Sequence, residues 1–189
     1  MDIILASSSP RRTQLLTQIG IVHEVMAPDV DESQYVSLEP RAMVRTLALK
    51  KVEAIRQHVH QGLIVGSDTT VILGDRILGK PHTKEDAKNM LQHLSGRDHT
   101  VCTGVAVMDA ATGRYRLGHS EAKVWLAAMT PYEIAAYIAS KEPMDKAGSY
   151  SIQGLCAKFV ERIDGDYYAV VGLPLAMTSR FLADLGYRF

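Results

Sequence analysis

The feature that most constrains the fold is an apolar strand followed directly by a helix-initiation signal at the N-terminus. Residues 2–6 read Asp-Ile-Ile-Leu-Ala, and Ser7-Ser8-Ser9-Pro10 then supplies capping serines and a proline suited to the first helical turn. Apolar residues at helical spacing continue to Ile19, and Gly20 is a suitable left-handed terminator. With a second strand expected at about residues 21–26, the N-terminus predicts the order strand, loop, helix, strand.

Helical and extended patterns alternate along the rest of the chain. Helices are predicted over about residues 40–55, 83–94, 131–140 and 174–185, and strands over about 63–66, 77–78, 100–108 and 116–127. Residues 159–163 and 167–171 are expected to form a further hairpin around Asp164-Gly165. Because turn residues join several of these strands antiparallel, the pattern predicts an α/β domain on a twisted mixed sheet.

Charge and composition exclude several classes of protein. The 21 basic and 21 acidic residues cancel, so the chain as a whole carries no field that would attract nucleic acid or an anionic membrane. With 47% hydrophobic residues the chain is expected to be globular, and its N-terminus predicts neither a signal peptide nor a spanning helix, which favours the cytoplasm. Cys102 and Cys156 are too far apart for a zinc pair and are expected to be reduced core residues.

The junction between the first strand and the first helix has the features of an anion site. A helix N-terminus favours negative charge, and Ser7, Arg11 and Arg12 add hydroxyl and guanidinium donors that suit phosphate oxygens. A serine-capped helix with two solvated arginines would have the same sequence. No Gly-x-x-x-x-Gly-Lys run occurs, which excludes a P-loop phosphate site.

Asp68 is the leading candidate for acid–base or metal chemistry. It is expected just beyond the end of the strand at residues 63–66, where a carboxylate can ligate a hard cation or accept a proton from water. A turn-forming aspartate would suit the same position. The loop residues Asp31 and Glu32 are weaker candidates, because acidic loops are commonly only solvated.

Other polar residues also suit ligand contacts. Lys80 precedes Pro81, which restricts the backbone and helps to hold the cation in place, whereas Lys51 lies midway along a predicted helix. Segments 142–148 and 152–154 are dense in turn formers and charges. This composition is typical of a ligand-lining loop, and an exposed loop shares it.

Taken together, these motifs resemble the Maf family in order and spacing. The matching runs in the first part of the chain are Ala6-Ser7-Ser8-Ser9-Pro10-Arg11-Arg12, Gly66-Ser67-Asp68-Thr69-Thr70-Val71, Gly79-Lys80-Pro81 and Leu94-Ser95-Gly96-Arg97-Asp98-His99-Thr100-Val101-Cys102-Thr103-Gly104. The later runs are Glu142-Pro143-Met144-Asp145-Lys146-Ala147-Gly148, Tyr150, Ile152-Gln153-Gly154, Gly165-Asp166-Tyr167-Tyr168 and Val171-Gly172-Leu173-Pro174-Leu175. The resemblance covers essentially the whole chain.

The resemblance implies a single two-lobed domain over residues 1–189, with a Maf/Ham1-like α/β fold on a twisted mixed sheet, flanking helices and a central cleft. It also implies a cytoplasmic location, a divalent metal cation (Mg²⁺ or Mn²⁺) and a homodimer, with no nucleic acid or membrane partner. The implied reaction is hydrolysis of a nucleoside triphosphate to a monophosphate and pyrophosphate, with dTTP and UTP preferred.

The resemblance further implies roles for individual residues. Asp68 is implied to be the proton acceptor and, with Glu32, a metal ligand. The residues implied to bind substrate are Ser7, Arg11, Arg12, Lys51, Thr69, Lys80 and Gln153. Arg11, Thr69 and Gln153 are the positions associated with substrate choice. Val52 departs from the family, which more often has alanine there, and this difference is expected to affect packing.

Two other functions fit the same motifs. A pyrophosphatase of the family's 7-methyl-GTP branch would differ in base preference, and that branch tends to carry an acidic residue where this chain has Gln153. A glutamine amide offers both a donor and an acceptor, which match the O4 and N3–H groups of uracil and thymine. A non-catalytic nucleotide-binding regulator of cell division would bind nucleotide without releasing pyrophosphate.

Overall fold

The computed structural model describes residues 1–189 and contains helices and strands in alternation. The elements in chain order are β1 (Ile3–Ala6), α1 (Pro10–Gln18), β2 (Glu24–Met26), η1 (Glu32–Tyr35), α2 (Pro40–Arg56), β3 (Leu63–Leu73), β4 (Arg76–Leu78), α3 (Lys84–Leu94), β5 (Asp98–Asp109), β6 (Tyr115–Leu126), α4 (Pro131–Ala139), η2 (Glu142–Asp145), η3 (Ala147–Ser149), η4 (Leu155–Phe159), β7 (Val160–Gly165), α5 (Tyr167–Val171) and α6 (Leu175–Asp184). The η elements are short 3-10 helices. None of the helices combines the length and the apolar composition that crossing a bilayer requires.

The strands form one seven-stranded sheet with the hydrogen-bonded order β2-β1-β3-β5-β6-β7, and β4 pairs with β3 off this path. β1 pairs in parallel with both β2 and β3, whereas β4 runs antiparallel to β3 and β7 antiparallel to β6. The sheet is therefore mixed and carries flanking helices, which confirms the predicted fold class.

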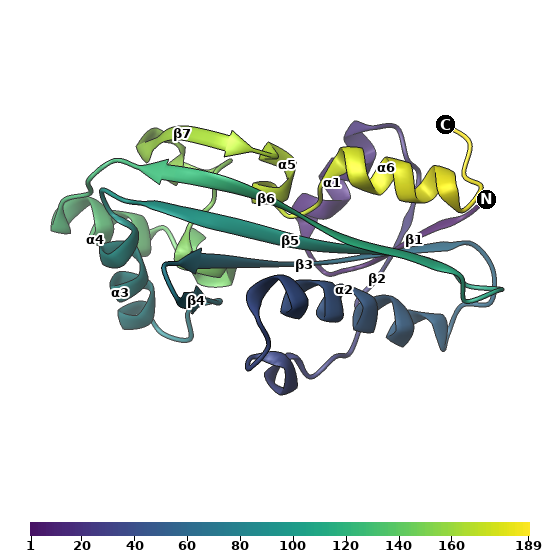
Figure 1. The fold of residues 1–189 in the computed structure, drawn as a ribbon. Coiled ribbons are helices and arrows are strands. Elements are labelled where there is room, and N and C mark those ends of the chain that lie inside the picture. The colour runs from purple at the N-terminus through teal and green to yellow at the C-terminus, as the bar shows by residue number, and fades with distance from the viewer. The chain divides into compact units, whose positions relative to one another are not determined.

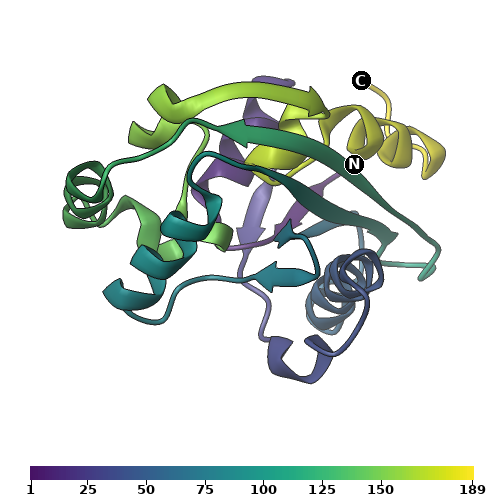
Figure 2. The same cartoon turned by 60° about the vertical axis from the view of Figure 1, so that its left-hand side comes forward.

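The chain divides into two compact units, and β3, β5 and β6 contribute residues to both. The first unit comprises Met1–Asp68, Thr103–Ser120 and Gly172–Phe189, and the second comprises Thr69–Cys102 and Glu121–Val171. In the first unit, α1 and α6 lie on one face of the strands and α2 lies on the other (Figure 1). In the second unit, α3 packs beside α4 (Figure 2).

The core of the first unit forms where α2 packs on the sheet. Its buried cluster joins residues of β1, α2, β3, β5 and the turn that follows β5: Ile4, Ala6, Ala48, Val52, Ile55, Ile64, Ala106, Met108 and Ala110. Val52 is fully buried in this cluster, so the family departure at this position falls on a packing residue.

Two glycines allow α2 to approach the sheet closely. A Cβ at Gly66 would lie 2.7 Å from Val52 Cγ1 and 2.8 Å from the Ala48 carbonyl oxygen. A Cβ at Gly104 of β5 would overlap the Val44 carbonyl. Because a glycine presents no side chain, both strands can pass directly beneath the helix. This close packing sets the position of the polar residues that α2 carries.

Several sequence predictions agree in detail with the structure. The helix predicted from about residue 83 begins with a capping box, since the Thr83 hydroxyl accepts the Asp86 N–H at 3.0 Å and the Asp86 carboxylate accepts the Thr83 N–H at 3.0 Å. Gly20 adopts φ 76°, the left-handed conformation expected at the end of α1. Cys102 and Cys156 are free and buried.

Two predictions of local structure were wrong. The strand expected over residues 63–66 continues as β3 to Leu73, so Asp68 lies within the strand and not beyond its end. The expected hairpin partner at residues 167–171 is the short helix α5. Its start is capped by Asp166, whose carboxylate accepts the Tyr168 and Ala169 N–H groups at 2.9 and 3.3 Å. This local capping outweighs the strand propensity of the valines and tyrosines that follow.

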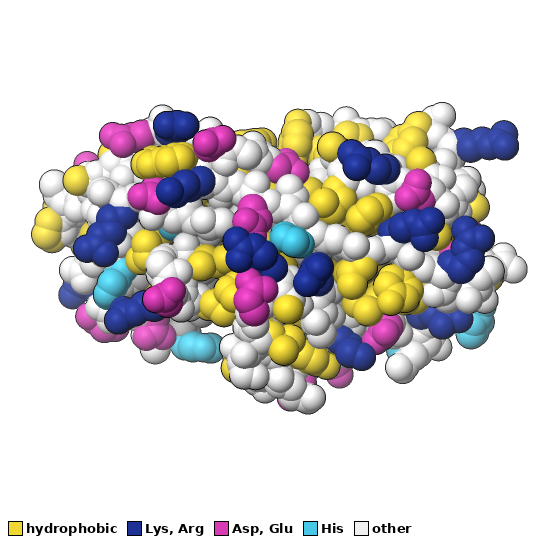
Figure 3. Space-filling view, in the orientation of Figure 1, with side chains coloured by type: hydrophobic (Ala, Val, Ile, Leu, Met, Phe, Trp, Pro, Cys, Tyr) yellow, Lys and Arg dark blue, Asp and Glu magenta, His cyan; other side chains and the backbone are white.

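Charged side chains of both signs are mixed on the surface. Figure 3 shows Lys and Arg interspersed with Asp and Glu on the visible face, so neither sign dominates it. This agrees with the net charge of zero. Attraction of a polyanionic ligand must therefore come from a local arrangement of charges.

Candidate functional site

The carboxyl end of β1 holds the first predicted residues. Ser7 is 4% exposed, and its Oγ accepts hydrogen bonds from the Ser9 backbone N–H and from Arg12 Nη1, both at 3.1 Å. Arg12 Nε also donates to the Gly172 carbonyl oxygen at 2.9 Å. The guanidinium is therefore fixed by two partners from opposite ends of the sequence, at the N-terminus of α1.

The second feature is an ammonium shared by two carboxylates. Lys51 Nζ lies 2.6 Å from Asp68 Oδ1 and 2.8 Å from Glu32 Oε1. Lys51 and Asp68 are each only 8% exposed, whereas half of the Glu32 side chain is exposed. The three residues come from α2, β3 and η1, so the structure brings together residues that lie far apart in the sequence.

The arginine group and the carboxylate group interact electrostatically. Burial is the largest effect on the pKa of the Arg12 guanidinium and lowers it below the ordinary value. The carboxylates of Asp68 and Glu32 raise this pKa, and the neighbouring Arg11 lowers it. A guanidinium remains charged despite such a shift. Arg11, Arg12, Glu32, Lys51 and Asp68 thus form one cluster of opposite charges in the first unit, which we call the charged cluster.

Two carboxylates of the charged cluster lie close together, although the structure contains no group of three or more His, Cys, Asp or Glu side chains placed to hold a metal ion. The Glu32 and Asp68 carboxylates converge on a single cationic group, the Lys51 ammonium, so they are close enough to face one ion. Asp68 Oδ2 makes no hydrogen bond within the chain. Carboxylate oxygens are the preferred protein ligands of Mg²⁺ and Mn²⁺.

The other three predicted residues belong to the second unit. Thr69 follows Asp68 directly on β3 and is half-buried. Lys80 is exposed in the turn after β4, where the Gly148 N–H donates to the Gly79 carbonyl oxygen at 3.0 Å. Gln153 is exposed, and its side chain makes no hydrogen bond. This backbone hydrogen bond therefore connects the turn that carries Lys80 to the segment just before Gln153 in the sequence.

Sequence reasoning missed the role of Ser67 and of the Gly172 carbonyl. The buried Ser67 Oγ donates to the Gly172 oxygen at 3.0 Å, and this oxygen also accepts from Arg12. A backbone acceptor has no signal in the sequence. In the run Gly66-Ser67-Asp68 the sequence indicated a chemical role only for the aspartate. The glycine allows α2 to approach the strand, and the serine binds the Gly172 oxygen.

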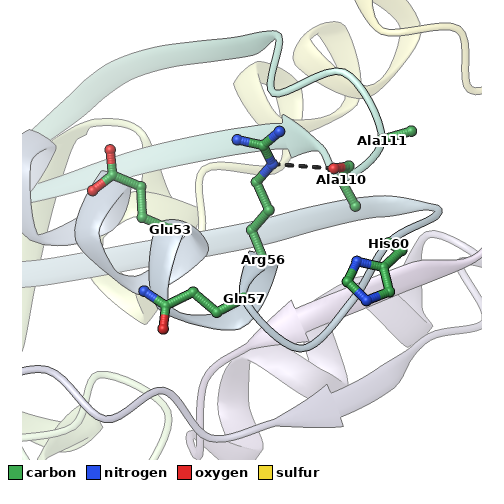
Figure 4. Close-up of a pocket in the computed structure, with 6 residues that line it drawn as sticks. All are labelled: Glu53, Arg56, Gln57, His60, Ala110 and Ala111. Carbon is green, nitrogen blue, oxygen red and sulfur yellow. Dashed lines mark hydrogen bonds between the residues drawn. The ribbon is translucent and has the colours of Figure 1, made fainter.

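One hollow in the first unit is lined by none of the residues of the charged cluster. It measures about 700 Å³ and is lined by Glu53, Arg56, Gln57, His60, Ala110 and Ala111. Figure 4 shows Arg56 pointing to the backbone of Ala110, whose carbonyl oxygen accepts from Nε at 3.1 Å. None of the predicted site residues lines it, so its size carries no argument for a substrate site.

Comparisons with known proteins agree with the sequence motifs. The model of the family described as Maf-like protein matches residues 2–185. A dTTP/UTP pyrophosphatase of Pelotomaculum thermopropionicum is 45% identical over 186 residues, covering 98% of this chain and 97% of the relative. A dTTP/UTP pyrophosphatase of Shewanella oneidensis is 47% identical over 194 residues, covering 98% and 99%.

Solved structures share the fold at much lower identity. The Staphylococcus aureus Ham1 protein matches with a TM-score of 0.54 and 12% identity, over 98% of this chain and 100% of the other. A HAM1 protein from Coxiella burnetii matches with a TM-score of 0.57 and 12% identity, over 97% and 99%. The likeness in fold covers almost the whole chain, and the identity to the relatives is high over the same length. The chain therefore belongs to the Maf family.

Proposed function

We propose that the chain hydrolyses dTTP and UTP to the nucleoside monophosphate and pyrophosphate. The observation that carries the proposal is the charged cluster, where a buried carboxylate is held by a lysine beside two arginines. Relatives about 45% identical over nearly the whole chain are named for this activity. The reaction breaks the bond between the α-phosphorus and the oxygen that bridges it to the β-phosphorus.

Asp68 is proposed as the general base. Lys51 binds Oδ1 and thereby orients the carboxylate, which leaves Oδ2 as the oxygen that accepts a proton from the attacking water. Arg11 and Arg12 would neutralise the charge of the triphosphate, and Lys80 is proposed to add a third cation. Positioning and charge neutralisation supply most of the rate enhancement in phosphoryl transfer.

Glu32 and Asp68 are proposed to hold a divalent cation, Mg²⁺ or Mn²⁺. The fit rests on the convergence of both carboxylates on one cationic position in the charged cluster. When bound, such an ion would neutralise phosphate charge and polarise the phosphoryl oxygens. Because Lys51 contacts both carboxylates, its flexible side chain must adjust when the ion binds.

Gln153 is proposed to select the base. Its exposed amide is not engaged within the chain, so both its donor and its acceptor can bind a ligand. These groups match the O4 acceptor and the N3–H donor of uracil and thymine. Thr69 and Arg11 are proposed to support the same choice.

The proposal is tested by the product pair and the nucleotide profile. We expect that the purified protein with Mg²⁺ or Mn²⁺ releases pyrophosphate and monophosphate, and that kcat/KM is higher for dTTP and UTP than for GTP and 7-methyl-GTP. Chromatography of the nucleotides and a pyrophosphate assay measure both. Release of orthophosphate with a nucleoside diphosphate would overturn the reaction, and nucleotide binding without turnover would favour a regulatory protein.

We expect that Gln153→Glu lowers kcat/KM for dTTP roughly ten- to a hundredfold. A carboxylate would leave an unmatched acceptor against O4, a mismatch of about 1–3 kcal/mol. Steady-state kinetics with dTTP, UTP, GTP and 7-methyl-GTP measure the effect. Gln92→Glu, which alters an exposed glutamine on α3, is the matched control. An equal loss for all four nucleotides would mean that Gln153 does not discriminate between bases.

A further inference from the structure

The short segment 151–155, which carries Gln153, is held at both ends by side chains from outside it. The Ser151 N–H donates to Tyr137 Oη at 3.1 Å. The Leu155 N–H donates to both oxygens of Glu142, at 3.1 and 3.0 Å. The anchored N–H groups lie two residues on either side of Gln153, so they restrain the backbone from which its side chain extends.

Tyr137 and Glu142 are joined to each other. Tyr137 Oη donates to Glu142 Oε1 at 2.8 Å, and Tyr137 is only 4% exposed on the inner side of α4. Burial raises the pKa of the Tyr137 hydroxyl, and the hydrogen bond to Glu142 raises it further. The hydroxyl therefore stays protonated, and it donates to Glu142 while accepting from Ser151.

The backbone around Glu142 is itself fixed. Lys141 ends α4 in the left-handed conformation with φ 64°, which costs a non-glycine residue about 1–2 kcal/mol. Lys146 Nζ binds the Glu142 carbonyl oxygen at 2.6 Å. Strained backbone of this kind persists only where surrounding contacts over-determine it. The backbone from which Glu142 extends is therefore fixed, and its carboxylate is held by the hydrogen bonds from Tyr137 Oη and the Leu155 N–H.

Gly154 shows how closely the segment is fitted to the carboxylate. A Cβ at this position would overlap the Glu142 carboxylate group. A side chain at residue 154 would push the carboxylate away from the Leu155 N–H. The contact between Glu142 and the Gln153 segment is therefore a specific feature of the packing.

We propose that Tyr137 and Glu142 are positioning residues that hold Gln153 for discrimination between pyrimidine and purine triphosphates. The inference rests on the proposed role of Gln153 in base selection. A glutamine side chain has several rotatable bonds, and only its backbone can be held before a ligand binds. Because a hydrogen bond weakens steeply away from its preferred distance and angle, the anchoring of residues 151 and 155 sets how well the amide meets the base.

The test uses Tyr137→Phe and Glu142→Gln in the full chain. Phenylalanine keeps the ring and removes the hydroxyl, and glutamine keeps the shape and removes one acceptor. We expect each variant to lower the ratio of kcat/KM for dTTP to that for GTP about tenfold, through the KM for dTTP, with kcat within about twofold. Because both changes break one network, the double variant should lower the ratio no further than the stronger single variant.

The matched controls are Tyr132→Phe, which alters an exposed tyrosine on α4, and Glu161→Gln, which alters an exposed glutamate on β7. Both should leave the ratio unchanged. Hydrogen exchange of the Ser151 and Leu155 amides, measured without nucleotide, provides a readout that does not depend on activity. We expect exchange at both amides to become at least about tenfold faster in the Tyr137 and Glu142 variants.

The outcomes separate the inference from the function on which it rests. If the wild type prefers pyrimidines and both variants retain the full ratio, or lose efficiency equally for all nucleotides, the inference is overturned and the proposed function stands. Unchanged amide exchange in both variants would also overturn it. If the wild type has no pyrimidine preference, the proposed base selection fails, and the inference fails with it.

Discussion

Asp68→Asn is expected to abolish most hydrolysis while the fold and nucleotide binding remain. The amide is almost isosteric with the carboxylate, but it cannot accept the proton from the attacking water. Loss of a general base typically reduces kcat by roughly 10²- to 10⁴-fold, and the weakened metal ligand would add to this. Initial rates of pyrophosphate release from dTTP measure the effect, and calorimetric titration with dTTP measures binding.

The structure explains why the Asp68 variant should still fold. The asparagine carbonyl can still accept from Lys51, and Lys51 keeps its ion pair with Glu32 at 2.8 Å. Asp29→Asn, which alters an exposed aspartate of the same unit, is the matched control and should retain full activity. Wild-type turnover by Asp68→Asn would remove Asp68 from the mechanism. A large loss of melting temperature would mean that inactivity reflects unfolding.

Lys51→Met is expected to lower the free energy of unfolding by about 3 kcal/mol, the lower part of the range for breaking a buried ion pair. The substitution leaves the Asp68 carboxylate, which is 8% exposed, without its ammonium partner at 2.6 Å. Methionine matches the length of the lysine stem, so the loss comes from the charge and not from a cavity. Urea denaturation followed by circular dichroism measures the change.

A double-mutant cycle identifies the cause of that loss. If the unpaired carboxylate is responsible, adding Asp68→Asn to Lys51→Met should restore part of the stability, because the uncompensated charge is removed. Lys50→Met is the matched control on the same helix, since the Lys50–Glu53 pair is more than 40% exposed on both sides and should contribute less than about 1 kcal/mol. Additive effects of the two substitutions would show that the contact contributes little.

The sequence alone was sufficient for the longer helices and for the family. The helix starting at Pro10, the start of α3 near residue 83 and the apolar face of α2 are local signals, and each was predicted correctly because its cause lies within a few neighbouring residues. The family was identified from the order and spacing of motifs over the whole chain, and the match to residues 2–185 confirms it.

Prediction from sequence was weaker where two local preferences compete. Residues 167–171 have a strand-like composition, and the cap formed by Asp166 turns them into a helix. The strand that contains Asp68 was predicted to end at Gly66, because polar residues usually mark a strand end, whereas β3 continues to Leu73. In β3 the polar run continues the strand, since α2 covers Gly66 and supplies Lys51 as a partner for the buried carboxylate.

By itself, the sequence determined which residues could act, namely the arginines at the start of α1, the aspartate on β3 and the polar loops. Only the tertiary structure decided how they are combined. Lys51 is shared between Glu32 and Asp68, and the Gln153 segment is held by Tyr137 and Glu142. Both arrangements depend on contacts between separate elements of the fold. Such contacts arise from the packing of α2 on glycine-bearing strands and of α4 beside its loop, and no local pattern of residues encodes a distance across that packing.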